Sequence, residues 1–488
     1  MCKTSVAGEP HVSFPTKPWK NQSYSPTRET IMKPHLLLPL PPPAETLKEA
    51  AALFHLSFPI AVTALLIYSR SVLSMLFLGF LGDLPLAAGS LAIAFANITG
   101  YSVLSGLSLG MEPLCSQAFG ANQPMLLFLT LHRSVIFLLC SSFPIAVLWF
   151  HMSKILLFLR QDPEITSLAR SYLLYTLPDL ISFSFIHPIR IYLRSQGITR
   201  PLTVAAAVSA ALHLPVGLLL VGRLRLGAPG VAAASAAANL SFLICLLPYL
   251  LRDPAWRAPN SEALSGWGPL ARLAAPSCAS VCLEWWWYEL MILLCGLLPD
   301  PKPAVAAMGV LIQTTALLYV FPSSIGLGMG MVAMGFAAGV REQWGRMFTS
   351  DGEILRLTAA ALPIVGLCEL GNCPQTVACG ILRGSARPAH AARVNLGAFY
   401  LVGTPVAVGL GFGLGLGFVG LWVGLLAAQV CCAGLMLYLV GATNWEAQAQ
   451  MAQLLTCAGE VKHVLGDLEE GREALLEGEK GEVDCCET

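Results

Sequence analysis

The chain has 488 residues and no formal net charge, because 29 Lys and Arg residues balance 29 Asp and Glu residues. Hydrophobic residues make up 55% of it and charged residues only 12%, about half the charged share of an ordinary soluble domain. This composition excludes a soluble globular protein and gives no electrostatic basis for binding nucleic acid, so we expect an all-α polytopic membrane protein.

The N-terminal half of the sequence predicts a tail followed by a bundle. Residues 1–48 are basic and rich in proline, and we expect them to be disordered and cytosolic. Hydrophobic stretches of about 20 residues or more, long enough to cross a bilayer, then recur and predict an N-terminal six-helix bundle over 49–251. These stretches lie at 52–80, 86–110, 124–150, 164–186, 200–221 and 229–251.

The C-terminal half follows a long polar interruption. Residues 252–269 carry several charges, prolines and glycines, and we predict a cytosolic linker there. A C-terminal helix bundle is predicted over 270–440, and an acidic tail over 441–488, to which we assign no chemistry. The hydrophobic stretches of this half lie at 270–298, 304–340, 353–376, 389–413 and 417–440.

The cysteines and the common catalytic motifs point away from metal or enzyme chemistry. Fifteen cysteines occur without any Cys-x-x-Cys pair, and we interpret them as small packing residues. We expect no structural metal, no obligatory disulfide and no cofactor. A Walker A loop and a His-Glu-x-x-His motif are missing, and no Gly-x-Ser-x-Gly sequence has the strand–turn–helix context of a nucleophile. The sequence therefore does not predict an enzyme.

Four short sequence matches occur in the same order in both halves. They pair Leu56–Pro59 with Leu273–Pro276, Leu107–Met111 with Ile325–Met329, Phe158–Glu164 with Met347–Glu353, and Leu193–Ser195 with Leu382–Gly384. We infer two six-helix bundles as parallel inverted-V repeats, related by an axis along the membrane normal, with the substrate site in the cleft between them.

The second copy of the repeat is shorter than the first. The offset between matched residues falls from 217–218 to 189, so 29 residues of the first half have no counterpart within 328–351. A continuous helix over 304–340 would be roughly 55 Å long, against a hydrocarbon core of roughly 30 Å. The stretch is too long for one span and too short for two, so we expect about 11 to 12 spans. A single crossing would invert everything that follows.

Two acids and three tryptophans occupy the middle of the first span after the linker. Ionisable groups inside a span are functional candidates because they are costly to place in lipid. Glu284 and Tyr288 share one helix face, and Glu289 lies about 140° from Glu284. A buried carboxyl group can exchange a proton near neutral pH, while aromatic rings attract organic cations. The alternative is a Trp belt at the membrane interface with one snorkelling glutamate.

A third acid lies in a later span. Glu369 is followed by Gly371 and Pro374, which favour a kinked helix. We expect Glu369 to be a cavity carboxylate.

Four other polar residues lie inside predicted spans. Gln313 and Asn97 are candidates to supply hydrogen bonds to a substrate, although such residues also hold helices together. Asp179 and Arg70 are predicted to be an ion-paired structural unit.

Five segments carry a family resemblance. They are Tyr68–Ser71 with Met75–Gly79, Pro113–Ala121, Glu284–Glu289, Cys368–Thr376 and Leu382–Gly384. Over about residues 45–440, the chain resembles the multidrug and toxic compound extrusion (MATE) transporters, specifically the plant DETOXIFICATION branch. The resemblance implies a twelve-helix secondary active transporter that exports small organic compounds or xenobiotics by proton antiport. It also implies that Glu284, Glu289 and Glu369 are the family's cavity acids and that Gln313 is a polar cavity residue.

The resemblance further implies the partners and the setting. We expect a monomer in membrane lipid that binds a small organic substrate and protons, in the plasma membrane or in an endomembrane such as the vacuole, Golgi or late endosome. One departure matters, because the segment that normally follows the eighth helix is missing after Gly328. A non-transporting truncated isoform or gene-model variant is therefore the alternative function, and a lipid flippase is a third.

Overall fold

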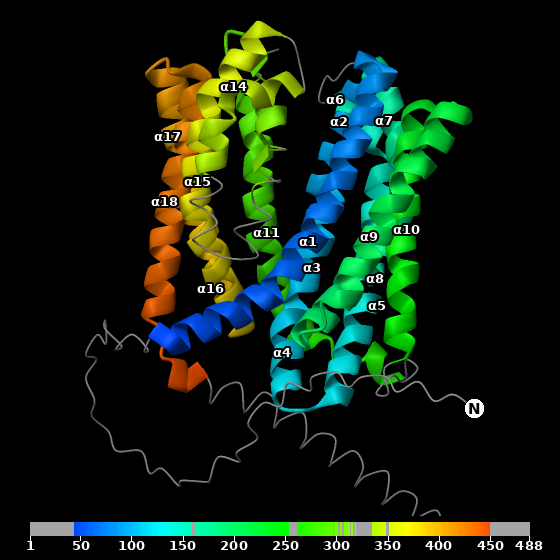
Figure 1. The fold of residues 1–488 in the computed structure, drawn as a ribbon, viewed down its shortest axis with the longest axis vertical. Helices are drawn as coiled ribbons and strands as arrows, with labels where there is room; N and C mark the ends of the chain where they lie inside the picture. The colour runs from blue at the N-terminus through cyan, green and yellow to red at the C-terminus, as the bar shows by residue number, and fades with distance from the viewer. Residues whose placement is uncertain are drawn as a thin grey trace, which may run out of the picture. The chain divides into compact units, whose positions relative to one another are not determined.

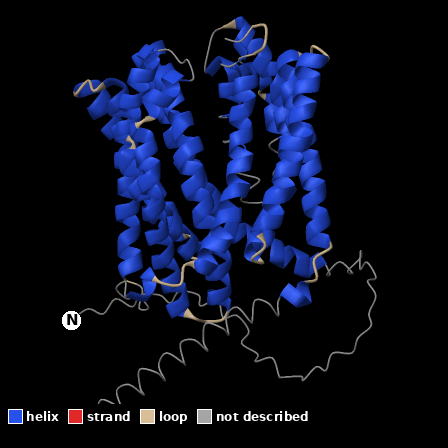
Figure 2. Cartoon of the chain, turned by 180° about the vertical axis from the view of Figure 1, so that it is seen from behind, coloured by secondary structure: helices blue, strands red, loops and turns tan. Residues whose placement is uncertain are grey.

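The structure is a computed structural model. It describes residues 43–158, 163–252, 261–295, 297–300, 334–347 and 351–448, together with short stretches between 303 and 318. All regular elements in this part of the chain are helices (Figure 2). Eight of the described helices are long and apolar enough to cross a membrane, which confirms the all-α polytopic fold class.

The N-terminal bundle comprises the elements from α1 to α10. The second predicted span is one long rod, which we call the α2–α4 rod, in which a π-helical turn and a 3₁₀ turn interrupt the α-helix. The elements are α1 (Pro43–Leu81), α2 (Asp83–Ala96), η1 (Asn97–Tyr101), α3 (Ser102–Ser108), η2 (Leu109–Met111), α4 (Glu112–Gly120), α5 (Pro124–Phe150), α6 (Met152–Phe158), α7 (Pro163–Tyr175), α8 (Leu177–Ser195), α9 (Arg200–Gly217), η3 (Leu218–Arg223) and α10 (Gly227–Leu251).

The C-terminal bundle comprises the elements from α11 to α18, and the turn η4 (Ser261–Leu264) precedes it. Asp351 begins α15, because its carboxylate accepts the backbone N–H groups of Glu353 at 2.8 Å and Ile354 at 3.2 Å. The elements are α11 (Gly268–Cys295), α14 (Arg341–Trp344), η5 (Gly345–Met347), α15 (Gly352–Gly384), α16 (Pro388–Asn395), η6 (Leu396–Gly403), α17 (Thr404–Val408), η7 (Gly409–Gly413) and α18 (Gly417–Gly441).

Each bundle has its own hydrophobic core. The buried residues of the C-terminal core run from Trp287 to Met436, and α15 packs along α18 (Figure 1). Two further clusters fill the N-terminal bundle, where α10 packs along α9 and α5 along α8. Apolar burial is thus divided between the two halves, except that Leu270 of α11 belongs to one of the N-terminal clusters.

The repeat is visible in the backbone. The N–H of Leu224 donates to the carbonyl of Leu219 after η3, and the N–H of Leu414 donates to the carbonyl of Gly409 after η7, both at 2.9 Å. Two residues of each loop have positive φ: Arg225 (52°) and Gly227 (63°), and Gly415 (69°) and Gly417 (54°). The same turn thus recurs 190 residues later, and the prediction of two repeated bundles is confirmed.

The described residues on either side of the shortened region fold back on each other. Trp344 Nε1 donates to Thr314 Oγ1 at 2.7 Å, although 30 residues separate them. A straight helix would hold these residues about 45 Å apart. The hydrogen bond therefore excludes one continuous helical span through 304–340. Residues 319–333 and 348–350, which include Gly328, lie outside the described part of the chain.

The direction of α15 follows from its neighbours. Along α11, the carbonyl of Ser280 accepts from Asn395 and that of Leu283 accepts from Tyr400, so α11 runs parallel to α16 and η6. The short turn from α15 to α16 makes those two helices antiparallel, and α15 is consequently antiparallel to α11. The end of α11 and the start of α15 therefore lie at the same end of the bundle. A single crossing, with inversion of Glu369, is excluded.

Candidate functional site

The two bundles meet along a seam of small residues. α11 packs antiparallel on the α2–α4 rod, with contacts at every fourth residue of each helix. A Cβ atom on Gly110 would lie 2.5 Å from the Ala274 nitrogen, and one on Gly106 would lie 2.6 Å from the Cys278 Cα. The contact pairs are Gly110 with Ala274, Gly106 with Cys278, Ser102 with Cys282, and Ile98 with Trp286. Small residues spaced by four let these backbones touch.

Glu284 lies on the face of α11 opposite the seam. It is two residues from Cys282, or about 200° around the helix, so it is directed into the C-terminal bundle. Its charge interacts there with Glu369 and Arg383, both on α15. Glu284 and Glu369, on helices predicted separately, therefore lie near enough for their charges to interact.

Glu369 is fully buried on α15. Its Oε2 accepts a hydrogen bond from Asn372 Nδ2 at 3.1 Å, while its Oε1 has no hydrogen-bond partner among the described residues. The side-chain oxygens of Gln375 and Gln429 are also buried without a partner in that part of the chain. Gly371 lets α15 approach Gln429 of α18 closely, because a Cβ at position 371 would lie 3.0 Å from the Gln429 side chain. The site thus contains polar oxygen atoms that no described residue satisfies.

Glu289 lies apart from these two acids. It is seven residues from Cys282, which returns it to the face of α11 that carries the seam. The seam ends one turn earlier, where Trp286 Nε1 donates to the Ile98 carbonyl at 3.1 Å. Asn97 precedes Ile98 in the π-helical turn η1 and is half-buried. Glu289 and Asn97 thus lie at the same end of the seam, on opposite bundles.

Tyr288 lies on the Glu284 side of α11. It is half-buried against the C-terminal core, and its ring meets that of Trp287 edge to face at 6.0 Å. Trp287 is held in turn by its Nε1, which donates to the Phe399 carbonyl at 2.9 Å. Gln313 lies outside the described residues.

The predicted contact between Asp179 and Arg70 takes a different form. Arg70 donates to Ser209 Oγ at 2.6 Å, and Asp179 accepts from Asn239 at 3.0 Å and from Tyr101 at 3.3 Å. Their charges interact, but among the described residues no ion pair within 4.0 Å joins them. They belong to a buried polar network of the N-terminal bundle.

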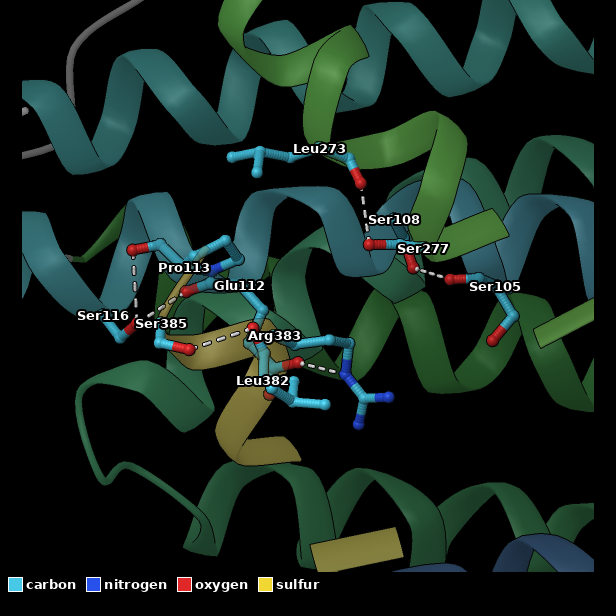
Figure 3. Close-up of polar contacts among 10 residues, drawn as sticks. All are labelled: Ser105, Ser108, Glu112, Pro113, Ser116, Leu273, Ser277, Leu382, Arg383 and Ser385. Carbon is cyan, nitrogen blue, oxygen red and sulfur yellow. Dashed lines mark hydrogen bonds and ion pairs between the residues drawn. The ribbon is translucent and has the colours of Figure 1, made fainter. Parts of the chain in front are cut away.

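An ion pair that the sequence did not predict joins the bundles. Arg383 Nε on α15 donates to Glu112 Oε2 on α4 at 3.2 Å, and both side chains are less than one-third exposed (Figure 3). It lies near Gly110, at the end of the seam where α11 begins. We call this end, which is next to the predicted linker, the linker end. Both residues border motifs noted above, but 271 positions separate them and no periodicity connects them.

Comparison with known proteins identifies the family. A sequence model of the MatE family matches residues 59–219, 276–340 and 325–408. Protein DETOXIFICATION 51 of Arabidopsis thaliana is 59% identical over 86% of this chain and 85% of its own length. The chain belongs to the MATE family. It is accordingly a multi-pass membrane transporter of small compounds, and the predicted family resemblance is confirmed.

Other members agree with this assignment. Protein DETOXIFICATION 52 of Arabidopsis thaliana is 55% identical over 87% of this MATE chain and 92% of its own length. The crystal structure of the eukaryotic MATE transporter AtDTX14 superposes with a TM-score of 0.80 at 27% identity, covering 84% of this chain and 99% of that one. The fold is therefore the MATE fold.

The comparisons also bear on the shortened region. The family model matches the first half in one piece, whereas it matches the second half in two pieces that overlap at residues 325–340. The alignment with DETOXIFICATION 51 extends over 454 positions but includes 86% of the 488 residues, or about 420. This MATE chain thus has fewer residues than its relative within the aligned range.

Proposed function

We propose that this MATE protein is a proton-coupled antiporter that exports small organic compounds, with Glu284, Glu289 and Glu369 as its exchange groups. Tyr288, Gln313 and Asn97 are assigned to substrate binding. The observation that carries the proposal is the fully buried Glu369, which has one carboxylate oxygen without a hydrogen-bond partner among the described residues and whose charge interacts with that of Glu284.

The physical argument is a matter of charge burial. A carboxylate placed in a low-dielectric interior costs several kcal/mol unless a cation or several donors compensate it. Asn372 supplies one donor to Glu369, and the neighbouring Glu284 adds a like charge rather than a compensating one. Protonation or an organic cation would relieve this cost, and competition between the two is the basis of antiport.

The substrate class follows from the same groups. Acids beside tryptophan and tyrosine rings favour aromatic organic cations, through charge attraction and cation–π contacts.

The expected setting is a monomer in the plasma membrane or in an endomembrane. Residues 252–269 and both tails are assigned to the cytosolic side, which fluorescence of pH-sensitive tags at either terminus would test.

The test is transport by purified protein in liposomes under an imposed pH gradient, with ethidium as the organic cation. Glu369→Gln and Glu284→Gln are expected to reduce proton-driven ethidium uptake at least tenfold. Glu353→Gln is the matched control, since Glu353 lies on the same helix α15 but pairs with Arg356 at its exposed end. If both inner variants transport as the wild type does, the proposal is wrong.

A second candidate function is a non-transporting truncated isoform of such a carrier. The specific observation in its favour is the residue deficit within the aligned range, together with the split family match at 325–340. Amplifying the transcript across the codons for Gly328 and Met329 tests it. Recovery of about 29 additional in-frame codons, and ethidium transport only by the longer protein, would support this candidate. Transport by the 488-residue chain would refute it.

A further inference from the structure

A charged bridge joins the bundles at the linker end. Two further ion pairs of the described residues, Arg341 with Glu342 and Arg356 with Glu353, join neighbours on the same segment. Arg383 instead crosses from α15 to Glu112 on α4 (Figure 3). Separating the bundles at this end requires this bridge to break.

The backbone packing beside the bridge leaves little room for partial opening. Gly110 and Ala274 touch backbone to backbone two residues from Glu112. Ser277 and Ser108 direct their hydroxyls to carbonyls of their own helices, those of Leu273 and Ser105, so they do not bind across the seam. The Glu112–Arg383 pair is therefore a directional polar contact across this closely packed end.

Arg383 also lies within electrostatic reach of the proposed proton site. Its guanidinium interacts with Glu284 on α11, and Glu284 interacts in turn with Glu369. Arg383 thus interacts with carboxylates of both bundles, with Glu112 in direct contact at 3.2 Å and with Glu284 through its charge. An ionised Glu284 attracts the same guanidinium, so the position that Arg383 prefers relative to Glu112 depends on whether Glu284 is charged.

Neutral thiols also lie beside this row of charges. Cys379 on α15 and Cys432 on α18 lie near Glu284, and Cys115 on α4 lies near Glu112. From α16 and η6, Asn395 and Tyr400 bind carbonyls of α11. Among these described neighbours, the strong charges are those of Glu112, Arg383, Glu284 and Glu369.

We propose that Arg383 is the coupling residue of this transporter, a positioning group whose shared attraction to Glu112 and Glu284 links proton binding to closure of the linker end. When Glu284 is ionised, it competes for the guanidinium and weakens the bridge to Glu112. When Glu284 carries a proton, the guanidinium binds Glu112 and holds the bundles together there. The inference rests on the proposed function, since it takes Glu284 as a proton site.

The first test compares the pH profile of ethidium transport in liposomes, from about pH 5.5 to pH 8. For the wild type, the ratio of the highest to the lowest transport rate over this pH range is the reference. Arg383→Gln and Glu112→Gln are expected to lower this ratio about fivefold, while Arg383→Lys keeps part of the pH dependence. Arg356→Gln is the matched control, because Arg356 lies on the same helix and forms an ion pair with Glu353 at 2.7 Å. An unchanged profile for Arg383→Gln would overturn the inference.

The charge-swapped double variant, Glu112→Arg with Arg383→Glu, separates coupling from simple bridging. A bridge alone would be restored by the swap, together with the wild-type pH profile. Under the proposal, the new glutamate faces Glu284 with a like charge, so thermal stability recovers but the profile does not. A wild-type profile in the double variant would therefore refute the inference.

Hydrogen exchange on the intact protein covers the case in which these variants fold poorly. Glu284→Gln mimics the neutral side chain, and the bridge should then tighten. Amide exchange in segments 112–120 and 382–388 is expected to slow about threefold relative to the wild type at the same pH. Equal or faster exchange would contradict the inference. If the wild type itself shows no proton-driven transport, the proposed function fails instead.

Discussion

Replacing Gly110 with alanine tests the seam, because this position has no space for a side chain. The new Cβ would lie 2.5 Å from the Ala274 nitrogen, whereas ordinary contacts begin near 3.4 Å. The neighbouring atom is backbone and cannot rotate away, so α11 and the α2–α4 rod must separate by nearly 1 Å. Overpacking of this kind costs about 1–3 kcal/mol.

The expected result is a melting temperature about 2–6 °C below that of the wild type, measured on detergent-solubilised protein by loss of the monodisperse size-exclusion peak. Gly120→Ala is the matched control, since it lies at the end of the same rod with nothing within 4 Å of its Cβ position. Gly110→Ala with Ala274→Gly should recover little, because the clash is with backbone. Unchanged stability in Gly110→Ala would refute the seam.

Two further predictions concern the folded-back region and the buried network. Thr314→Val removes the acceptor of Trp344 Nε1 and should lower stability by about 1 kcal/mol, seen as a lower melting temperature and a red-shifted tryptophan emission. Thr376→Val removes a hydrogen bond within its own helix and should have a smaller effect. Equal effects of the two variants would argue against the fold-back. Asp179→Leu should destabilise the N-terminal bundle by about 3 kcal/mol, because Asn239 and Tyr101 lose their acceptor and Arg70 loses its counter-charge. Asp179→Asn should lower the melting temperature less. A wild-type melting temperature in Asp179→Leu would contradict the role of Asp179 in this network.

The helices and the repeat could be predicted because they depend on local patterns. Hydrophobic stretches long enough for a bilayer located most spans, and the short matches located both the repeat and its deficit. The fourth span was predicted to end at 186, but α8 continues to Ser195. Polar residues such as His187 and Arg190 lower its hydropathy, while Ile191 and Tyr192 remain buried and keep the helix packed.

The contacts between bundles could be predicted only in part. The four-residue spacing of Ser102, Gly106 and Gly110 is a helix-packing signal that the sequence contains. The helical phase of α11 likewise separates Glu284 from Glu289. The bridge between Glu112 and Arg383 has no such signal, because it depends on how two separately folded bundles meet. The fold-back at Thr314 and Trp344 also depends on tertiary packing.

Proton release during transport tests the central claim most directly. Protein in liposomes loaded with a pH-sensitive dye would receive ethidium, then phenolic compounds and organic anions in parallel, without an imposed gradient. We predict that ethidium entry drives protons in the opposite direction, and that Glu369→Gln abolishes this proton movement while Glu353→Gln preserves it. Ethidium transport by the wild type with no accompanying proton movement would contradict the account.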